Sequence, residues 1–170
     1  MHEKGVDELF AAAKQLKQQY GDGVELHIVG SFEEAYKPTI DELERLGVVK
    51  YHGYQSDMKP FYAMANCLVL PSYHEGMSNV LLEAAASGRP VITSNIHGCL
   101  EAVEDGVSGL LCERKNAEDL YRTMKRFLDL PREQRRQMGL AGRKRMEEVF
   151  DKRKVVDQTL RRLFAEETVC

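Results

Sequence analysis

The sequence has no long hydrophobic segment, no excess charge of one sign and no clustered cysteines. Its longest nearly uncharged stretch, residues 61–74, is shorter than the ~20 apolar residues of a membrane-spanning helix. The start of the chain has no apolar signal-peptide core. With 24 Lys and Arg against 27 Asp and Glu, the net charge of −3 offers no general attraction for nucleic acid. We therefore predict a cytoplasmic protein without a membrane span or a nucleic-acid partner.

The cysteines are widely separated, and none has a Cys or His partner at metal-ligand spacing. This spacing argues against a zinc site and against a disulfide framework. We predict that no metal is bound and that all four thiols are reduced: Cys67, Cys99, Cys112 and Cys170.

A chain of 170 residues, 43% hydrophobic and 30% charged, is long enough for one core, and it contains no repeat, linker or low-complexity segment. Short apolar runs alternate with segments of helical periodicity, and Gly, Pro or polar clusters close each run. Strands are expected at 25–29, 48–52, 67–70, 90–93 and 109–112. Helices are expected at 5–20, 33–46, 57–65, 79–87 and 117–128, with two charged helices from about 131 to 165.

This alternation predicts an α/β fold: one domain over residues 1–170, with a Rossmann-like parallel sheet flanked by helices and strands buried on both faces. Ligands of such sheets bind at the carboxyl ends of the strands. The chain opens on a helix, whereas the first strand of a doubly wound sheet is central. We therefore expect a gap in the middle of the sheet.

The most informative segment runs from Pro71 to Ala84 and contains Glu75 and Glu83. Their spacing of eight residues carries little information, because two other glutamate pairs share it, Glu25/Glu33 and Glu34/Glu42. Their context is more specific, since Glu75 lies in a loop after a strand and Glu83 on the helix that follows. Either carboxylate could instead be a solvated acid. A capping role for Glu83 is disfavoured because Leu81 occupies the third helical position.

A strand, a loop and a helix N-terminus together form an anion site. Gly76 allows close approach of the backbone, and the N–H groups around Ser78, Asn79 and Val80 suit a diphosphate. Helical side chains lean toward the N-terminus, so Glu83 can reach the same mouth and accept hydrogen bonds from vicinal hydroxyls. Glu75, which is nearer the loop, could accept hydrogen bonds from the hydroxyls of a sugar.

The segment Glu75–Ala84, followed by Gly88-Arg-Pro-Val-Ile, resembles the Glu-(seven residues)-Glu signature of retaining GT-B glycosyltransferases of family 4, also called group 1. The resemblance covers essentially the whole chain and implies the C-terminal, donor-binding half of such an enzyme. The sequence of residues 73–79 is most similar to that of family members that glycosylate undecaprenyl-diphosphate-linked glycans. Other matching segments are Lys4–Asp7, 28–30, 51–54, 98–101 and 104–110.

The resemblance implies transfer of a sugar, hexosyl or N-acetylhexosaminyl, from a UDP-sugar to a glycan or polyprenyl-diphosphate-linked acceptor, without a metal cofactor. It assigns the donor diphosphate to Lys4, the sugar hydroxyls to Glu75 and the ribose to Glu83. Residues near the sugar would be Met77, Ser78 and Asn79, and the nucleobase would contact Gly53, Tyr54 and Gln55.

The chain departs from the family pattern in three places. The loop at 31–33 is not glycine-rich, and the first strand with its diphosphate arginine is missing, as is the acceptor-binding domain. We therefore expect no glycan transfer by this chain alone, because half a cleft cannot hold donor and acceptor together. Two alternatives stay open, a nucleotide-sugar binding module without turnover and a sugar-nucleotide epimerase of the same architecture.

Three other features are weaker candidates. His74 beside Glu75 could act in acid–base catalysis, although neighbouring loop residues rarely face each other, and His27 and His52 are interpreted as strand residues. The motifs typical of hydrolases, Walker nucleotidases and dinucleotide enzymes are absent. Basic segments are read as solvated helix faces or as a peripheral contact with the inner face of a membrane: 132–145, 152–154 and 161–162.

Overall fold

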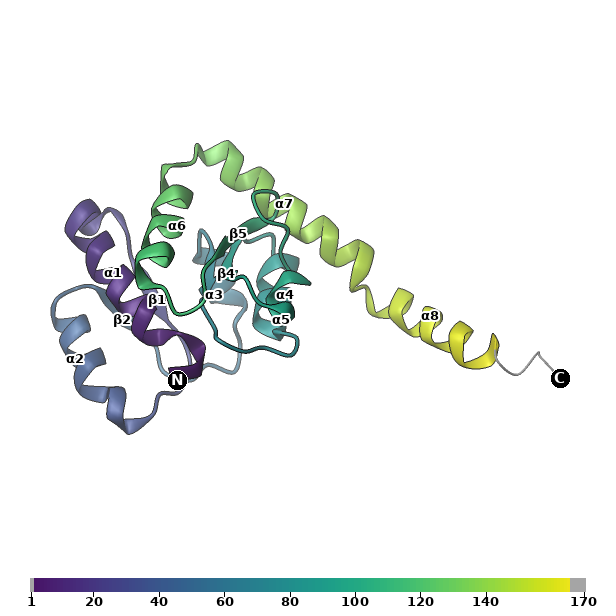
Figure 1. Ribbon diagram of the computed structural model, residues 1–170, viewed down its shortest axis with the longest axis horizontal. Coiled ribbons are helices and arrows are strands. Elements are labelled where there is room, and N and C mark those ends of the chain that lie inside the picture. Colours follow the sequence, from purple (N-terminus) through teal and green to yellow (C-terminus); the bar gives the residue numbers. More distant parts are fainter. Residues whose placement is uncertain (1, 166–170) are drawn as a thin grey trace.

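The computed structural model of the protein describes residues 2–165 (Figure 1). It contains the five predicted strands, each within two residues of its expected bounds. The strands are β1 (Leu26–Ile28), β2 (Val49–Tyr51), β3 (Leu68–Leu70), β4 (Val91–Ser94) and β5 (Gly109–Cys112).

Helices separate the strands in the predicted order. The α-helices are α1 (Val6–Tyr20), α2 (Lys37–Arg45), α3 (Lys59–Met64), α4 (Asn79–Ala86), α5 (His97–Leu100), α6 (Ala117–Asp129), α7 (Arg132–Val149) and α8 (Lys152–Ala165). Three single 3₁₀ turns are η1 (His2–Lys4), η2 (Gly21–Gly23) and η3 (Glu34–Tyr36).

Two helices begin later than predicted, because each has a proline in its first turn. The helix expected at 33–46 is divided into η3 and α2, with Pro38 at the start of α2, and α3 likewise begins beside Pro60. Proline favours the first helical turn, where its missing N–H is not needed. The four-residue helix α5 was not predicted.

All strand pairs are parallel, but they form two sheets, β1–β2 and β3–β4–β5. The break falls between β1 and β3. This is the position at which the expected central gap would lie.

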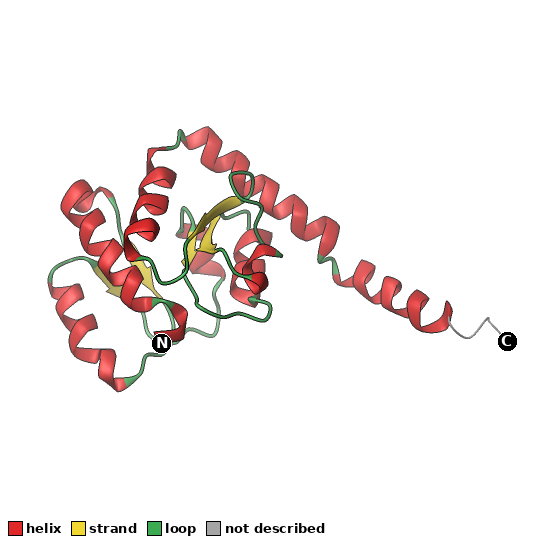
Figure 2. Cartoon of the chain, in the orientation of Figure 1, coloured by secondary structure: helices red, strands yellow, loops and turns green. Residues whose placement is uncertain are grey.

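Helices cover the three-stranded sheet on both sides, as Figure 2 shows. On one side, α1 and α6 pack on β4 and β5 through Leu16, Ile92 and Phe127, with Leu26 of β1 at the edge of this cluster. On the other side, α4, α5 and α7 pack around Leu81, with Val91 and Met146. A third cluster joins α1 and α2 to β1 and β2. The result is a helix–sheet–helix sandwich, typical of α/β domains.

The prediction that the strands are buried on both faces is wrong for part of the chain. Every residue of β4 is buried, whereas all residues of β1 and β3 are only partly buried. β4 has a strand on each side, but β1 and β3 each pair along one edge. Within residues 2–165, β1 and β3 each have one edge without a partner strand, and both are more accessible than β4.

The last two helices continue away from this body (Figure 1). α7 packs against α4, while α8 extends beyond it and exposes Leu160, Leu163 and Phe164. No helix within residues 2–165 is both long and apolar enough to cross a membrane.

Candidate functional site

Two predicted site residues that are far apart in sequence meet at the end of β3. Lys4 of η1 donates from Nζ to Oε1 of Glu75 at 2.7 Å. The side chain of Glu75 is 10% exposed and that of Lys4 is 54% exposed. The pair therefore combines a largely buried carboxylate with a cation that solvent or a ligand can reach.

Backbone contacts hold η1 against the end of β3. Gly5 has a left-handed backbone, with φ of 68°, and a Cβ atom there would lie 2.1 Å from the carbonyl oxygen of Pro71. Only glycine fits such a close approach. The N–H of Tyr73 also donates to the carbonyl of Glu3 at 2.8 Å. The position of Lys4 relative to the loop after β3 is thus fixed by main-chain packing.

The loop after β3 leads into the N-terminus of α4, as predicted. Ser78 is the N-cap residue and is buried, and its carbonyl accepts from the N–H groups of Leu81 and Leu82 at 3.1 Å. Gly76, Met77, Asn79 and Val80 are exposed around it. The first N–H groups of a helix have no intrahelical acceptor, so this end provides donors for an anion.

Glu83 lies one turn further along α4 and is exposed. Its Oε2 accepts a hydrogen bond of 3.0 Å from the hydroxyl of Tyr62 in α3. Burial, followed by this hydrogen bond, raises the pKa of Tyr62. The tyrosine therefore remains a donor and orients the carboxylate.

The loop Gly53–Gln55 follows β2 on the other side of the sheet break. Tyr54 is 75% exposed, and Gln55 donates to the carbonyl of His52 at 2.8 Å. The His52 ring contacts Phe61 of α3 edge-on, with centroids 5.1 Å apart. Because Tyr62 of the same helix holds Glu83, α3 links this loop to α4.

A cavity of about 750 Å³ opens at the carboxyl ends of β3, β4 and β5. It is lined by Tyr73, His74, Glu75, Gly76, Asn95, Ile96, His97 and Arg114. Of the predicted site residues, the cavity therefore collects Glu75 and Gly76. Glu83 and the loop Gly53–Gln55 lie outside its lining.

Sequence reasoning missed the part of the cavity built by the loops after β4 and β5. The signal was available, since ligands of parallel sheets bind beyond the carboxyl ends of the strands and 95–97 and 114 follow two such ends. The short helix α5 is part of this wall. A Cβ atom at Gly98 would lie 2.1 Å from the carbonyl oxygen of Glu75, so α5 packs directly on the loop that carries this residue.

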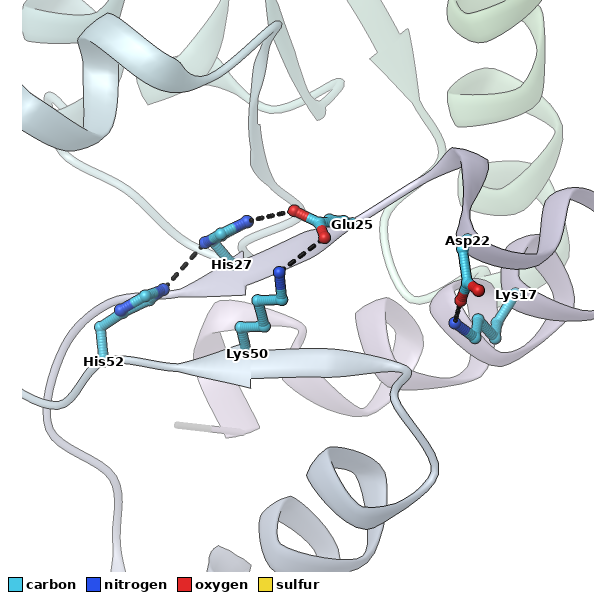
Figure 3. Close-up of polar contacts among 6 residues, drawn as sticks. All are labelled: Lys17, Asp22, Glu25, His27, Lys50 and His52. Atoms are coloured by element: carbon cyan, nitrogen blue, oxygen red, sulfur yellow. Dashed lines mark hydrogen bonds and ion pairs between the residues drawn. The ribbon is translucent and has the colours of Figure 1, made fainter.

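His27 and His52 form a polar cluster with Glu25 and Lys50, shown in Figure 3. The predicted strand position holds for His27 in β1, and His52 follows the last residue of β2. Nδ1 of His27 lies 2.8 Å from Nε2 of His52, and the rings are nearly parallel, at 5°. Glu25 accepts from Lys50 at 2.5 Å. The cluster occupies the face of β1–β2 opposite the third apolar cluster.

The described cysteines are free thiols: Cys67, Cys99 and Cys112. Burial raises the pKa of all three, to about 12 for Cys67 and to about 11 for Cys112. Cys170 lies outside the described residues. Within residues 2–165, no three or more His, Cys, Asp or Glu side chains converge as metal ligands would.

Comparison with known proteins identifies the family. The chain matches the family described as "Glycosyl transferases group 1" over residues 1–145. It therefore belongs to this family of glycosyltransferases.

Two curated relatives illustrate the range of family members. Over 128 residues, the chain is 36% identical to the N,N'-diacetylbacillosaminyl-diphospho-undecaprenol alpha-1,3-N-acetylgalactosaminyltransferase of Campylobacter jejuni, covering 74% of this chain and 32% of that protein. It is 32% identical over 163 residues to the glycogen synthase of Mycobacterium tuberculosis, covering 93% and 39%. The chain thus spans about a third of the length of these relatives.

Solved structures agree with the fold. The chain superposes on Anabaena HepE, crystallised with UDP-glucose, with a TM-score of 0.82 and 24% identity, covering 97% of this chain and 46% of that one. For a glycosyltransferase from Rickettsia africae the TM-score is 0.85 at 21% identity, and the superposition covers 99% of this chain and 46% of that one. The fold is that of the GT-B glycosyltransferases and corresponds to their C-terminal half.

Proposed function

We propose that this chain is the donor-binding half of a retaining glycosyltransferase that uses a UDP-sugar. The observation that carries the proposal is the Lys4–Glu75 contact beside the N-terminus of α4. A cation, a helix N-terminus and an oriented carboxylate are the groups that a diphosphate and a sugar require. HepE was crystallised with UDP-glucose, which supports the choice of nucleotide.

In this proposal each group has a separate task. Lys4 and the N–H groups at the start of α4 bind the diphosphate, whose negative charge grows as the sugar departs. Glu75 accepts from sugar hydroxyls, while Glu83, held by Tyr62, accepts from the ribose. Gly53–Gln55 provides the base contact. Because Lys4 contacts Glu75 before donor binding, its amine must turn toward the diphosphate when the donor arrives.

No metal ion is needed in this scheme, because the cation and the helix end supply the positive charge. The acceptor is proposed to be a glycan or a polyprenyl-diphosphate-linked glycan, since one relative is named for an undecaprenol-diphosphate substrate. The other wall of the cleft, facing this donor half, would come from a further domain outside residues 2–165. Transfer would require that wall, so the 170-residue chain alone is expected to bind donor without forming glycan.

Contact with an anionic membrane surface is a further part of the proposal. α8 has five cationic side chains and one acidic one, Asp157, and it exposes an apolar side that includes Val156, Leu160 and Leu163. Such helices lie in the membrane interface. Sedimentation with phosphatidylserine vesicles, compared with phosphatidylcholine vesicles, tests this, and equal binding to both would contradict it.

The donor site is tested by titrating UDP into Glu83→Ala by calorimetry, in the presence and absence of EDTA. Loss of a charged hydrogen bond should weaken binding by ~1–3 kcal/mol. Glu75→Ala should reduce the preference among UDP-sugars more than the affinity for UDP. Glu42→Ala, an exposed acid on α2, is the matched control. Unchanged UDP affinity of Glu83→Ala would remove the site, and loss of binding with EDTA would contradict the metal-free scheme.

A further inference from the structure

The cavity continues past Glu75 to the loops after β4 and β5, and its far wall contains Arg114. We propose that Arg114, together with Lys115, forms a subsite for an anionic group of the acceptor, a phosphate or a carboxylate. This inference rests on the proposed function, because it places the acceptor beside the donor sugar.

The guanidinium of Arg114 is positioned by a rigid neighbour. Its Nη1 donates to the carbonyl of Tyr73 at 3.5 Å. Tyr73 is only 2% exposed, and its hydroxyl lies 2.7 Å from both carboxylate oxygens of Glu8 in α1. Arg114 is therefore attached to the same buried residue that begins the Glu75 loop, while its remaining N–H donors are available to a ligand.

Lys115 adds a second cation through an unusual backbone conformation. With φ of 60°, it is the one non-glycine residue of positive φ within residues 2–165. Its Nζ lies 4.7 Å from the centre of the Tyr73 ring. Strained residues of this kind tend to occur at functional sites. Here this conformation brings two consecutive cations to one residue, Arg114 to the carbonyl of Tyr73 and Lys115 to its ring.

Acids do not neutralise these cations. Across residues 2–165, no carboxylate oxygen lies within 4.0 Å of the side-chain nitrogens of Arg114 or Lys115. The acid of the cavity lining, Glu75, is already paired with Lys4, and Glu8 accepts from the Tyr73 hydroxyl. The planar fork of an arginine matches the two oxygens of a phosphate or carboxylate.

The subsite is built from a different strand end than the place proposed for the donor diphosphate. That place lies at the end of β3, beside Lys4, whereas Arg114 follows β5, two strands away. Adjacent strands are about 4.8 Å apart, so the backbones at the two strand ends are separated by roughly 10 Å, and the Arg114 side chain reaches back to the carbonyl of Tyr73. The cavity thus has cations from two strand ends, and we assign the pair after β5 to a second anionic group.

The experiment measures binding of inorganic diphosphate and of glucuronate to the protein saturated with UDP, by calorimetry. We expect one of the two anions to bind to the wild type and to bind at least about tenfold more weakly to Arg114→Gln, with the UDP affinity changed less than twofold. Arg114→Lys should lose part of the affinity for the anion, because lysine keeps the positive charge but cannot make the two parallel hydrogen bonds of a guanidinium. Arg45→Gln removes the same charge from α2 and should bind like the wild type.

The result also distinguishes the source of the anion. Stronger binding of diphosphate indicates a phosphate-linked acceptor, and stronger binding of glucuronate indicates an acidic sugar. The inference is overturned if neither anion binds, if Arg114→Gln binds as the wild type does, or if UDP displaces the anion. Failure of the proposed function would instead appear as absence of UDP binding, and titration of the UDP-free protein would then still compare Arg114→Gln with the wild type.

Discussion

The two parts of the fold, the two-stranded sheet β1–β2 and the three-stranded sheet β3–β4–β5, differ in how deeply their strands are buried. In β3–β4–β5 the central strand is buried along its whole length, and the cavity opens at the ends of all three strands. In β1–β2, helices cover one face, and the other carries Glu25, His27, Lys50 and His52. A parallel strand is thus fully buried only where it has neighbours on both edges. The strands of the three-stranded half end at the cavity that contains Glu75, whereas the two-stranded half exposes a polar surface.

The largest expected difference between the halves is in core stability. Ile92 of β4 is 1% exposed, so Ile92→Ala should reduce the free energy of unfolding by about 2–5 kcal/mol. Ile28→Ala removes the same atoms from the half-buried strand β1 and should cost less than half as much. Urea unfolding measures both, with the m-value as a check on two-state behaviour. Equal losses would mean that the two halves form one continuous core.

Thiol labelling should separate the halves by reaction rate. Burial raises the pKa of Cys112 from 9.0 to about 11, so its thiolate at pH 8 should be about 100-fold scarcer in the folded protein. Native Cys112 is therefore expected to react with iodoacetamide far more slowly than the urea-unfolded chain. Mass spectrometry of labelled peptides measures this.

A reporter cysteine extends the labelling to the other half. Ile28→Cys on β1 should react faster than Cys112 in the folded state, because β1 is only partly buried. Labelling of both positions at one rate would show that the sheet break gives reagents no extra access.

The smallest expected effect concerns the pH dependence of the polar face. The hydrogen bond from Lys50, followed by that from His27, lowers the pKa of Glu25 in the folded protein below its ordinary value of 4.5. A depressed carboxyl pKa stabilises the fold above the unfolded pKa, and the contribution is lost as the pH falls through the folded value. Glu25→Gln should therefore lower Tm by about 1–2 °C at pH 6, and the difference should vanish near pH 3.

Glu42→Gln, which removes an exposed acid from α2, serves as the surface control for this series. Thermal scans between pH 6 and pH 3 provide the measurement. A difference for Glu25→Gln that stays constant over this range would show that the ion pair on β1–β2 contributes nothing.

Much of the fold could be predicted from the sequence because it depends on local patterns. Apolar runs closed by Gly or Pro located all five strands, and the helix at the start of the chain led to the expected sheet gap. Partial burial of β1 and β3 was missed, because burial depends on neighbours rather than on a strand's own residues. Helix α5 was missed because four residues are too few to display a period.

The site was only partly predictable. The motif placed Glu75 on a loop and Glu83 on the following helix, and the structure has both there. The contact between Lys4 and Glu75 spans 71 positions and arises from packing of η1 on the end of β3, which no spacing reveals. The bond from Tyr62 to Glu83 and the place of Arg114 in the cavity also depend on tertiary structure.

The close packing of Gly98 on the carbonyl oxygens of Glu75 and Gly76 affects how a survey of all substitutions should be interpreted. Any side chain at position 98 would collide with the main chain of the loop, at 2.1 Å and 2.4 Å from those two oxygens. Position 98 should therefore tolerate change as poorly as Glu75, although it offers no chemical group of its own. Intolerance at position 98 would reflect close packing, whereas intolerance at position 75 would reflect the role of the carboxylate in ligand binding. Measurements of ligand affinity distinguish the two causes.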